Sequence, residues 1–238
     1  MFKKLFLFLA LCLPTWAVTP VLIDHGGVTL SGSVALTGTD AQLFLVNLTG
    51  FGGTTLVSDD QGNTYTLKPD SGGCASTCTS RNGNNLQLWA YVVNPMTAGT
   101  VTFTLVANGT VGSIEVQVWK LTNTFDQNTS GTYAGTGPNW QWGPITPSCS
   151  DAVVASAVTI TNAAAGPTGI DSGFTITDSN SSGAVIGGAL AYKIQSGAAS
   201  AEDPTWSFAG GNSNAGSNIS FCYVATTSPL VKHKIISQ

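Results

Sequence analysis

Residues 54–67 read Thr-Thr-Leu-Val-Ser-Asp-Asp-Gln-Gly-Asn-Thr-Tyr-Thr-Leu, and this stretch indicates the fold class. Two short runs of apolar and β-branched residues flank a polar centre, which is typical of two strands joined by a tight turn. Gly62 can adopt a positive φ at low cost, so the polar centre predicts a hairpin turn. The stretch therefore predicts antiparallel β-structure.

The same kind of short run, bounded by Gly, Asn, Asp and Pro, recurs along the chain, whereas helical periodicity is almost absent. No short repeat or heptad is visible. We therefore expect an all-β fold, a two-layer antiparallel β-sandwich of jelly-roll or related topology. About twelve short strands are predicted, over residues 21–24, 42–48, 54–58, 64–67, 86–93, 100–105, 113–121, 152–160, 173–177, 187–194, 205–208 and 219–225.

The first seventeen residues have the layout of a secretory signal peptide. Lys3 and Lys4 give a positive start, residues 5–13 form an apolar run, and Ala17 supplies a small residue for cleavage. The apolar run is shorter than the about 20 residues that span a bilayer. We therefore expect a secreted or cell-surface protein without a transmembrane segment after removal of the leader. The predicted organisation is a signal peptide (1–17), a single β-sandwich domain (18–225) and a C-terminal tail (226–238).

Charged residues are scarce in this chain. Asp, Glu, Lys and Arg make up 8% of it, against about 25% in a typical soluble domain. Removing Lys3 and Lys4 with the leader leaves six basic residues against twelve acidic ones, a net charge of −6. The only basic run is Lys232-His233-Lys234, so the chain lacks the electrostatic footprint of a nucleic-acid-binding protein. We expect no nucleic-acid partner.

Four cysteines follow the leader: Cys74, Cys78, Cys149 and Cys222. An even number in an oxidising compartment predicts two disulfides. A four-cysteine zinc site is the lesser alternative, because it needs close C-x2-C pairs and neither Cys149 nor Cys222 has a near partner. Three pairings are possible. Cys74 and Cys78 can close a small loop, and Cys149 and Cys222 each border a strand pattern, so we predict the pairs Cys74–Cys78 and Cys149–Cys222.

Few residues could carry catalysis. The sequence has two histidines, His25 and His233, and neither a G-x-S-x-G nor an H-E-x-x-H motif. Glu115 is the only acidic residue inside a clear strand pattern, and the paired carboxylates of a glycosidase would need an acidic neighbour beside it. Glu202 and Asp203 precede a proline in a predicted turn. We interpret the acids as solvated loop residues and expect a non-catalytic protein without a cofactor.

A calcium site is a minor candidate. Asp59, Asp60 and Asn63 cluster around Gly62 and offer the oxygen ligands that calcium takes. The spacing and the distal Glu of an EF-hand are absent, and turn chemistry explains the same residues without an ion. We therefore predict no metal and keep these three residues as a weak alternative.

The candidate ligand-binding residues lie in the segment 122–147, which we expect to form a long surface excursion. Trp140 and Trp142 are two apart and share a side of an extended chain, with Asn139 and Gln141 beside them and Tyr133 nearby. Exposed rings could stack on sugars while the amides bind hydroxyl groups. The other interpretation is that the rings cover an open end of the core, which is the commoner role of large aromatics.

Five stretches stand in a fixed order in the chain: Val57–Tyr65, Trp89–Pro95, Ser172–Asp178, Ala189–Ile194 and Asp203–Trp206. Together, over roughly residues 42–225, they resemble an uncharacterised family of β-sandwich proteins from bacterial, environmental and phage-derived sequences. The resemblance implies a jelly-roll, lectin-like sandwich with surface or adhesive roles, and it supplies no catalytic residues. The leader and the four cysteines depart from the family and favour a secreted cellular protein over a virion part.

Three functions follow from these patterns. The first is a non-catalytic extracellular sandwich that acts in surface adhesion or glycan binding. The second is a structural subunit that self-assembles into an extracellular fibre or coat through its uncharged strands. The third is a hydrolase with an unrecognised site.

Overall fold

The computed structural model describes residues 19–29, 32–51, 54–68, 80–82, 85–108, 111–121, 123–129, 131–132, 138–161, 166–180, 186–209 and 215–223. The predictions for the leader, for the Cys74–Cys78 pair, for Tyr133 and for the tail 226–238 lie outside these residues.

All regular structure in the described residues is β-strand, and every strand pair is antiparallel. The first half of the chain contains β1 (Val21–Thr29), β2 (Ser33–Thr37), β3 (Leu43–Phe51), β4 (Thr54–Asp59), β5 (Thr66–Lys68), β6 (Ser80–Asn82), β7 (Asn85–Val93), β8 (Thr100–Asn108) and β9 (Val111–Lys120). The second half contains β10 (Asn123–Asn128), β11 (Gly131–Thr132), β12 (Asn139–Trp140), β13 (Ala152–Thr161), β14 (Pro167–Ile170), β15 (Thr175–Asn180), β16 (Ile186–Gln195), β17 (Trp206–Phe208) and β18 (Ala215–Tyr223).

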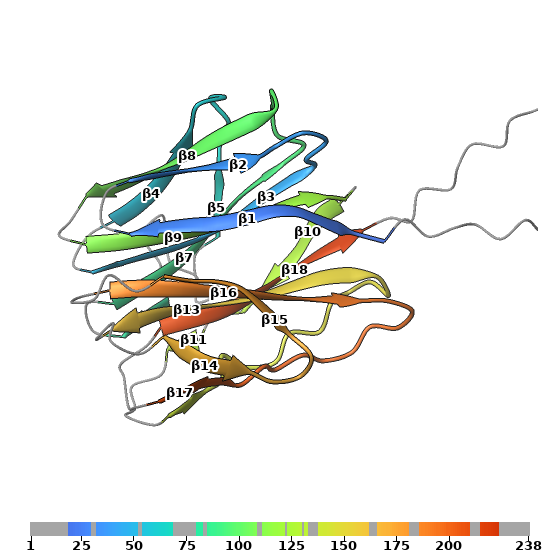
Figure 1. Ribbon diagram of the computed structural model, residues 1–238. Helices are drawn as coiled ribbons and strands as arrows, with labels where there is room; N and C mark the ends of the chain where they lie inside the picture. The colour runs from blue at the N-terminus through green and yellow to red at the C-terminus, as the bar shows by residue number, and fades with distance from the viewer. Residues whose placement is uncertain are drawn as a thin grey trace, which may run out of the picture.

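These strands form four sheets stacked as four layers (Figure 1). Small sheet 1 has the order β2-β8-β4, and large sheet 1 has the order β1-β9-β3-β7-β5 with β6 added on β7. Large sheet 2 has the order β10-β18-β13-β16-β15 with β11 added on β18, and small sheet 2 has the order β12-β17-β14. Small sheet 1 lies at one end of the stack and small sheet 2 at the other (Figure 1).

Three hydrophobic cores fill the three spaces between the layers. Phe44, Val46 and Phe103 lie in the first, between small and large sheet 1. The second joins the two large sheets, and the third, between large and small sheet 2, contains Trp140 and Trp206. Because each large sheet is covered on both faces, its central strands are apolar on both sides. Residues 43–46 and 152–155 are accordingly fully buried without alternation.

The two halves of the chain repeat one strand order. In each half the first strand pairs with the last, the last pairs with a long inner strand (β3 or β13), and that inner strand pairs with the penultimate strand of its large sheet: β1-β9-β3-β7 and β10-β18-β13-β16. The small sheets repeat as β2-β8-β4 and β12-β17-β14. The chain is therefore a tandem repeat of about 100 residues, a period at which no repeat was predicted.

The repeat extends to individual residues in register. Tyr91 on β7 pairs with Leu45 and with Thr66, and Tyr192 on β16 pairs with Ala155 and with Thr175. Both tyrosines follow an alanine, and both threonines begin the short edge strand of their large sheet. The same side chains therefore occupy the same places in the two large sheets.

A β-bulge also recurs at one point of the repeat. The register of β1 shifts between Leu22 and Asp24, opposite Trp119, and that of β10 shifts between Phe125 and Gln127, opposite Phe221. Bulges bend and twist the strand that carries them. The first strand of each half is thus bent at the same place.

An aspartate ties the turn after β4, and another the turn after β14, to the small sheet of its half. The backbone N–H of Asp60 donates to the carbonyl of Thr102, whose N–H donates to the Asp60 carboxylate at 3.1 Å. Asp171 makes the same two bonds with Thr205, at 3.2 and 2.7 Å. The turns that follow need a positive φ, which Gly62 and Gly173 supply.

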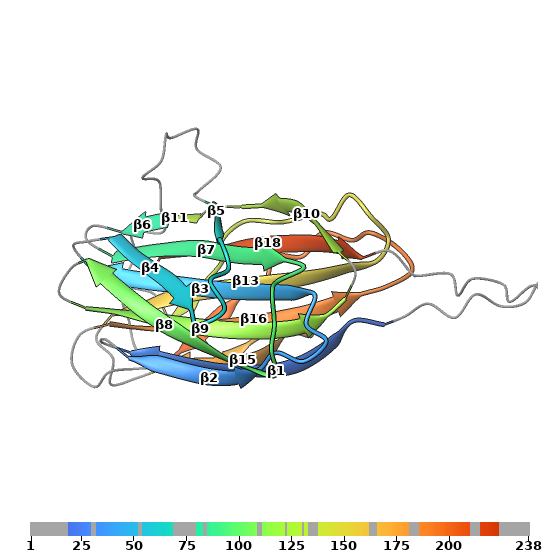
Figure 2. The same cartoon turned by 90° about the horizontal axis from the view of Figure 1, so that it is seen from above.

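The two halves pack face to face through their large sheets, and the strands of the two sheets are aligned along a common axis (Figure 2). Strand β9 packs on β16 and β7 packs on β18, which is the same contact with the halves exchanged; β3 on β16 and β7 on β13 form a second such pair. The contacts are those of a two-fold dimer made within one chain.

Several expectations are confirmed and others are corrected. The all-β antiparallel class is confirmed. The strand number was too low, and two layers are replaced by four because the chain contains two stacked sandwiches. The predicted hairpin at residues 54–67 is wrong, since β4 pairs with β8 in small sheet 1 while β5 pairs with β7 in large sheet 1. The turn connects two layers rather than two neighbouring strands.

Candidate functional site

The predicted aromatic site lies largely inside the molecule. Trp140 and Trp142 are 1% and 2% exposed, and their rings stack with centroids 6.2 Å apart in the core between large and small sheet 2. Trp142 lies over Gly216, where a Cβ would come within 2.2 Å of the indole. Of the two interpretations, the structure favours core packing, because buried rings cannot present a face to a sugar.

The polar neighbours of these rings lie on the opposite side of the same strands. Asn139 and Gln141 are exposed while Trp140 and Trp142 are buried, as the alternation of an extended chain requires. On the adjacent strand Thr205 and Ser207 are partly exposed, whereas Trp206 between them is buried. The Gln141 amide donates to the Thr205 hydroxyl at 3.0 Å.

Two carboxylates border this row. The backbone carbonyl of Asp203 accepts a bond from Gln141, and its side chain is half-buried. Burial and then the neighbouring Asp171 raise the pKa of Asp203. We call the six residues Asn139, Gln141, Asp171, Asp203, Thr205 and Ser207 the outer polar face of small sheet 2. This face carries amide, hydroxyl and carboxylate groups, and buried tryptophans lie beneath it.

The weak calcium candidate is occupied by turn hydrogen bonds. Asp59 accepts bonds from the N–H groups of Gln61 and Asn63, and from the Tyr65 hydroxyl at 2.6 Å. Asp60 accepts from Thr102, and Asn63 is bonded to the backbone of Met96 in both directions. These side chains hold the turn together and tie it to Met96 and Thr102, so the geometry gives calcium no support.

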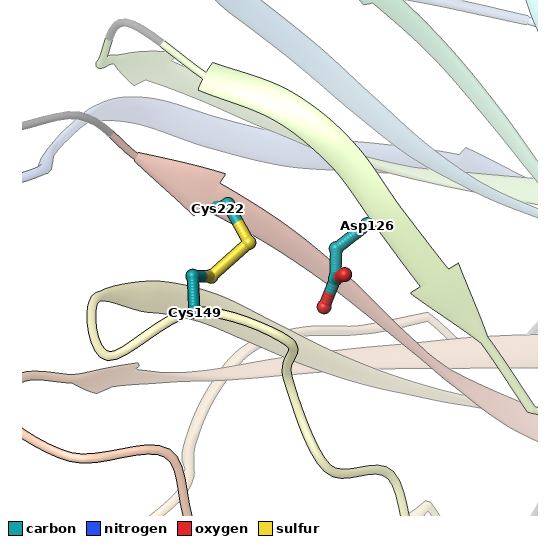
Figure 3. Close-up of side chains that lie close together, drawn as sticks. All are labelled: Asp126, Cys149 and Cys222. Atoms are coloured by element: carbon teal, nitrogen blue, oxygen red, sulfur yellow. A yellow bond between two sulfur atoms is a disulfide. The ribbon is translucent and has the colours of Figure 1, made fainter.

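The predicted disulfide between Cys149 and Cys222 is confirmed, with the Cα atoms 5.8 Å apart. Asp126 lies beside it (Figure 3) and forms with the two sulfurs a group of potential metal ligands. The sulfurs are bonded to each other, and the Asp126 carboxylate accepts bonds from Ser148 and Ser220. The group therefore anchors the segment that enters β13.

The interpretation of Glu202 as a solvated turn residue is wrong, and Glu115, which was expected in a strand, is also shielded from solvent. Glu202 is 4% exposed, and both of its oxygens accept bonds from Lys193 at 2.8 Å. Glu115 is fully buried between the two large sheets, and burial raises its pKa to about 8. The alternation of β9 could have revealed this, because Glu115 shares its face with Trp119, a large apolar side chain that packs in the second core.

Polar side chains surround Glu115 in the otherwise apolar second core. Its carboxyl oxygens accept bonds from Asn47 at 2.7 Å and from Ser113 at 2.8 Å. Gln87 donates to Asn47 and accepts from Ser217 of the other half. Sequence reasoning missed this network.

One histidine is described, His25, and it meets an acid of the other half. Its Nδ1 lies 3.2 Å from Asp178, and the ring is partly exposed. Burial raises the pKa of Asp178, and the hydrogen bond and charge of His25 act in the opposite direction. The pair joins β1 to β15.

Comparison with known proteins adds no relative: no protein-family model matches the chain, and no curated protein or solved structure matches it significantly. The resemblance to lectin-like sandwiches therefore stays a prediction. Among the described residues, no helix is long and apolar enough to cross a membrane.

Proposed function

We propose that the chain is a secreted, non-catalytic protein built of two jelly rolls, which acts in adhesion by binding a neutral glycan on the outer polar face of small sheet 2. The strand orders β1-β9-β3-β7 and β2-β8-β4, repeated in the second half, support the jelly-roll description. The leader pattern of residues 1–17 and the disulfide support secretion.

The observation that carries the glycan proposal is the outward row of Asn139 and Gln141 beside Thr205, Ser207 and Asp203. Amide, hydroxyl and carboxylate groups are the partners that sugar hydroxyls need. Trp140, Trp142 and Trp206 lie beneath the row and hold its strands in place. Because the row carries no cation, its affinity rests on hydrogen bonds to neutral groups and changes little with salt.

The test is binding of the full-length secreted protein to a glycan array and to insoluble polysaccharides. The double change Asn139→Ala with Gln141→Ala should abolish binding and leave the melting temperature nearly unchanged, because both side chains are exposed. Ser58→Ala with Thr104→Ala, on the outer side of small sheet 1, is the matched control and should bind normally. Binding that survives the first change, or no binding to any glycan, would overturn the proposal.

A second function, a self-assembling structural subunit, is favoured by one observation on the opposite end of the stack. Leu56 and Val106 are cross-strand neighbours in small sheet 1, and they are 38% and 44% exposed. Ser33, Ser58 and Thr104 continue this uncharged outer face. Electron microscopy and sedimentation would reveal fibres or oligomers, which Leu56→Lys should disperse. A monomer at high concentration would exclude this second function.

A further inference from the structure

Along one edge of the stack, the first half of the chain meets β15 of the second half through polar contacts. His25 lies 3.2 Å from Asp178, and Gln117 donates to Thr177 at 3.0 Å. Farther along, Asn180 donates to Glu115 at 3.4 Å. We call the residues His25, Glu115, Gln117, Thr177, Asp178 and Asn180 the polar seam.

The backbone around the seam is shaped to admit these groups. A Cβ on Gly27 would lie 1.9 Å from the amide nitrogen of Asn180, so only glycine lets that side chain cross β1 toward Glu115. A Cβ on Gly188 would lie 2.2 Å from Glu115 Oε2. Both glycines give space to one carboxyl and its donor. The carboxyl is therefore built into the junction between the halves.

The charge that faces Glu115 is of its own sign: it is Asp178 of β15. Asp24 and His25 of β1 act on Asp178. Strands β3 and β16 present neutral groups, Asn47 and Gly188. Among the described side chains, His25 is thus the one cation-forming group at the seam, and it contacts Asp178 rather than Glu115. An ionised Glu115 has hydrogen bonds but no countercharge in direct contact, which is costly in a buried site.

We propose that the polar seam is a pH-dependent contact between the two halves. The contact is closed while Glu115 is protonated, and it weakens when Glu115 ionises. Ionisation places a buried negative charge beside Asp178, and β15 relieves it by moving away and admitting water. This proposal concerns the junction of the halves and does not depend on the proposed function.

The direction of the pH dependence follows from the raised pKa of about 8, against 4.5 for an ordinary glutamate. Between these values the folded chain holds a proton on Glu115 that the unfolded chain has lost, so stability falls as pH rises. Below about 4.5 the contribution is fully present, and above about 8 it is lost and the dependence levels off. Burial is the first cause, and the bonds from Ser113, Asn180 and Asn47 oppose it.

The experiment compares urea unfolding of the full-length protein and of Glu115→Gln from pH 4 to 10. Glutamine keeps the size and cannot ionise. The ratio of the wild-type unfolding constant to that of the variant should rise by up to about tenfold per pH unit between pH 5 and 8, then level off. Asp40→Asn, which removes an exposed carboxylate outside the seam, is the matched control and should show no such rise. A ratio that stays flat for Glu115→Gln overturns the proposal.

Hydrogen exchange on the unaltered protein tests the same idea without a variant. After correction for the intrinsic rates, amides of β15 should lose protection between pH 6 and pH 9, while those of β13, in the centre of the same sheet, keep theirs. Equal behaviour of β15 and β13 would also overturn the proposal, whether or not Glu115→Gln folds.

Discussion

The junctions at the start of β3 and at the start of β13 correspond to each other, but they are held together by different interactions. In the first half Asp40, before β3, forms an exposed ion pair with Lys120 at the end of β9, at 2.8 Å. In the second half Cys149, before β13, forms a disulfide with Cys222 near the end of β18. An exposed ion pair contributes at most about 1 kcal/mol, and a disulfide usually contributes several times more. The repeated topology is thus secured mainly in the second half.

The cores under the two small sheets also differ, and the second half again has the stronger contacts. Small sheet 1 has strands of five to nine residues and covers its core with Val34 and Leu36 from β2. Small sheet 2 has strands of two to four residues and covers its core with Trp140, Trp142 and Trp206. Larger rings compensate for shorter strands. All the exposed large hydrophobic side chains of the described residues belong to the first half: Val21, Leu56, Leu67, Met96 and Val106.

The largest difference in stability between the two halves should come from the double change Trp140→Ala with Trp142→Ala. Both rings are buried, so the free energy of unfolding should fall by about 3–5 kcal/mol per ring. The matched change in the first half, Val34→Ala with Leu36→Ala, removes less buried volume and should cost less. Urea unfolding measures both. If the tryptophan variant kept its stability, the rings would not be core residues, and stacking on a ligand would return as their role.

Removing the disulfide should have the next largest effect. Its loop spans 73 residues, for which the chain-entropy model gives roughly 4 kcal/mol. Cys149→Ser with Cys222→Ser should therefore lower the melting temperature strongly, whereas Asp40→Ala with Lys120→Ala should lower it slightly. Differential scanning calorimetry of the two double variants compares them directly. Similar losses in both would mean that the two closures are equivalent after all.

A third prediction exchanges a contact between the halves. Glu115 meets Gly188, and the corresponding contact with the halves exchanged is Ser217 with Gln87. Gly188→Gln alone places a large side chain against Glu115 and should destabilise by about 1–3 kcal/mol. Adding Glu115→Ser copies the Ser217–Gln87 pair and should recover much of the loss. Unfolding free energies of the two single variants and of the double variant give the coupling, and a purely additive result would refute the equivalence.

The smallest effects should come from Asp60→Asn and Asp171→Asn. The bond from Thr102 holds the pKa of Asp60 below its ordinary value. At Asp171 burial acts to raise the pKa, but the bonds from Thr205 outweigh it and the pKa is lowered as well. Each carboxylate therefore adds stability that is present above about pH 4 and is lost as pH falls below it. Both variants should show a small, similar decrease in melting temperature at pH 7 that disappears at pH 3. A marked difference between the two variants in the loss of melting temperature would show that the two aspartates are not equivalent.

The sequence predicted the strands well because period-two patterns and turn residues are local signals. The number of layers is not local. Residues 43–46 and 152–155 are apolar without alternation, which indicates a strand covered on both faces, but a short apolar run is also common in a two-layer core. The hairpin at 54–67 failed for a related reason, because a turn between layers uses the same residues as a turn between neighbours.

The candidate site was predicted in part. The segment around Asn139 and Gln141 was singled out as a candidate ligand-binding site, and that role stays a prediction. Which side of Trp140 and Trp142 faces the core depends on a sheet formed with β17, 66 residues along the chain from Trp140. The Cys149–Cys222 pair could be predicted from compartment and strand context. The seam around Glu115 could not, because it forms only when the two halves meet.

The reciprocal packing of the two large sheets also sets how the molecule can grow. The inner face of each large sheet is covered by the other half, as in a two-fold dimer. Neither of these faces therefore has room for a third unit. A further copy of the repeat, or a second molecule, must therefore attach by another surface. Among the described residues, the two ends of the stack offer neighbours surfaces of different chemistry, the hydroxyl-rich side of β2-β8-β4 and the amide-bearing side of β12-β17-β14.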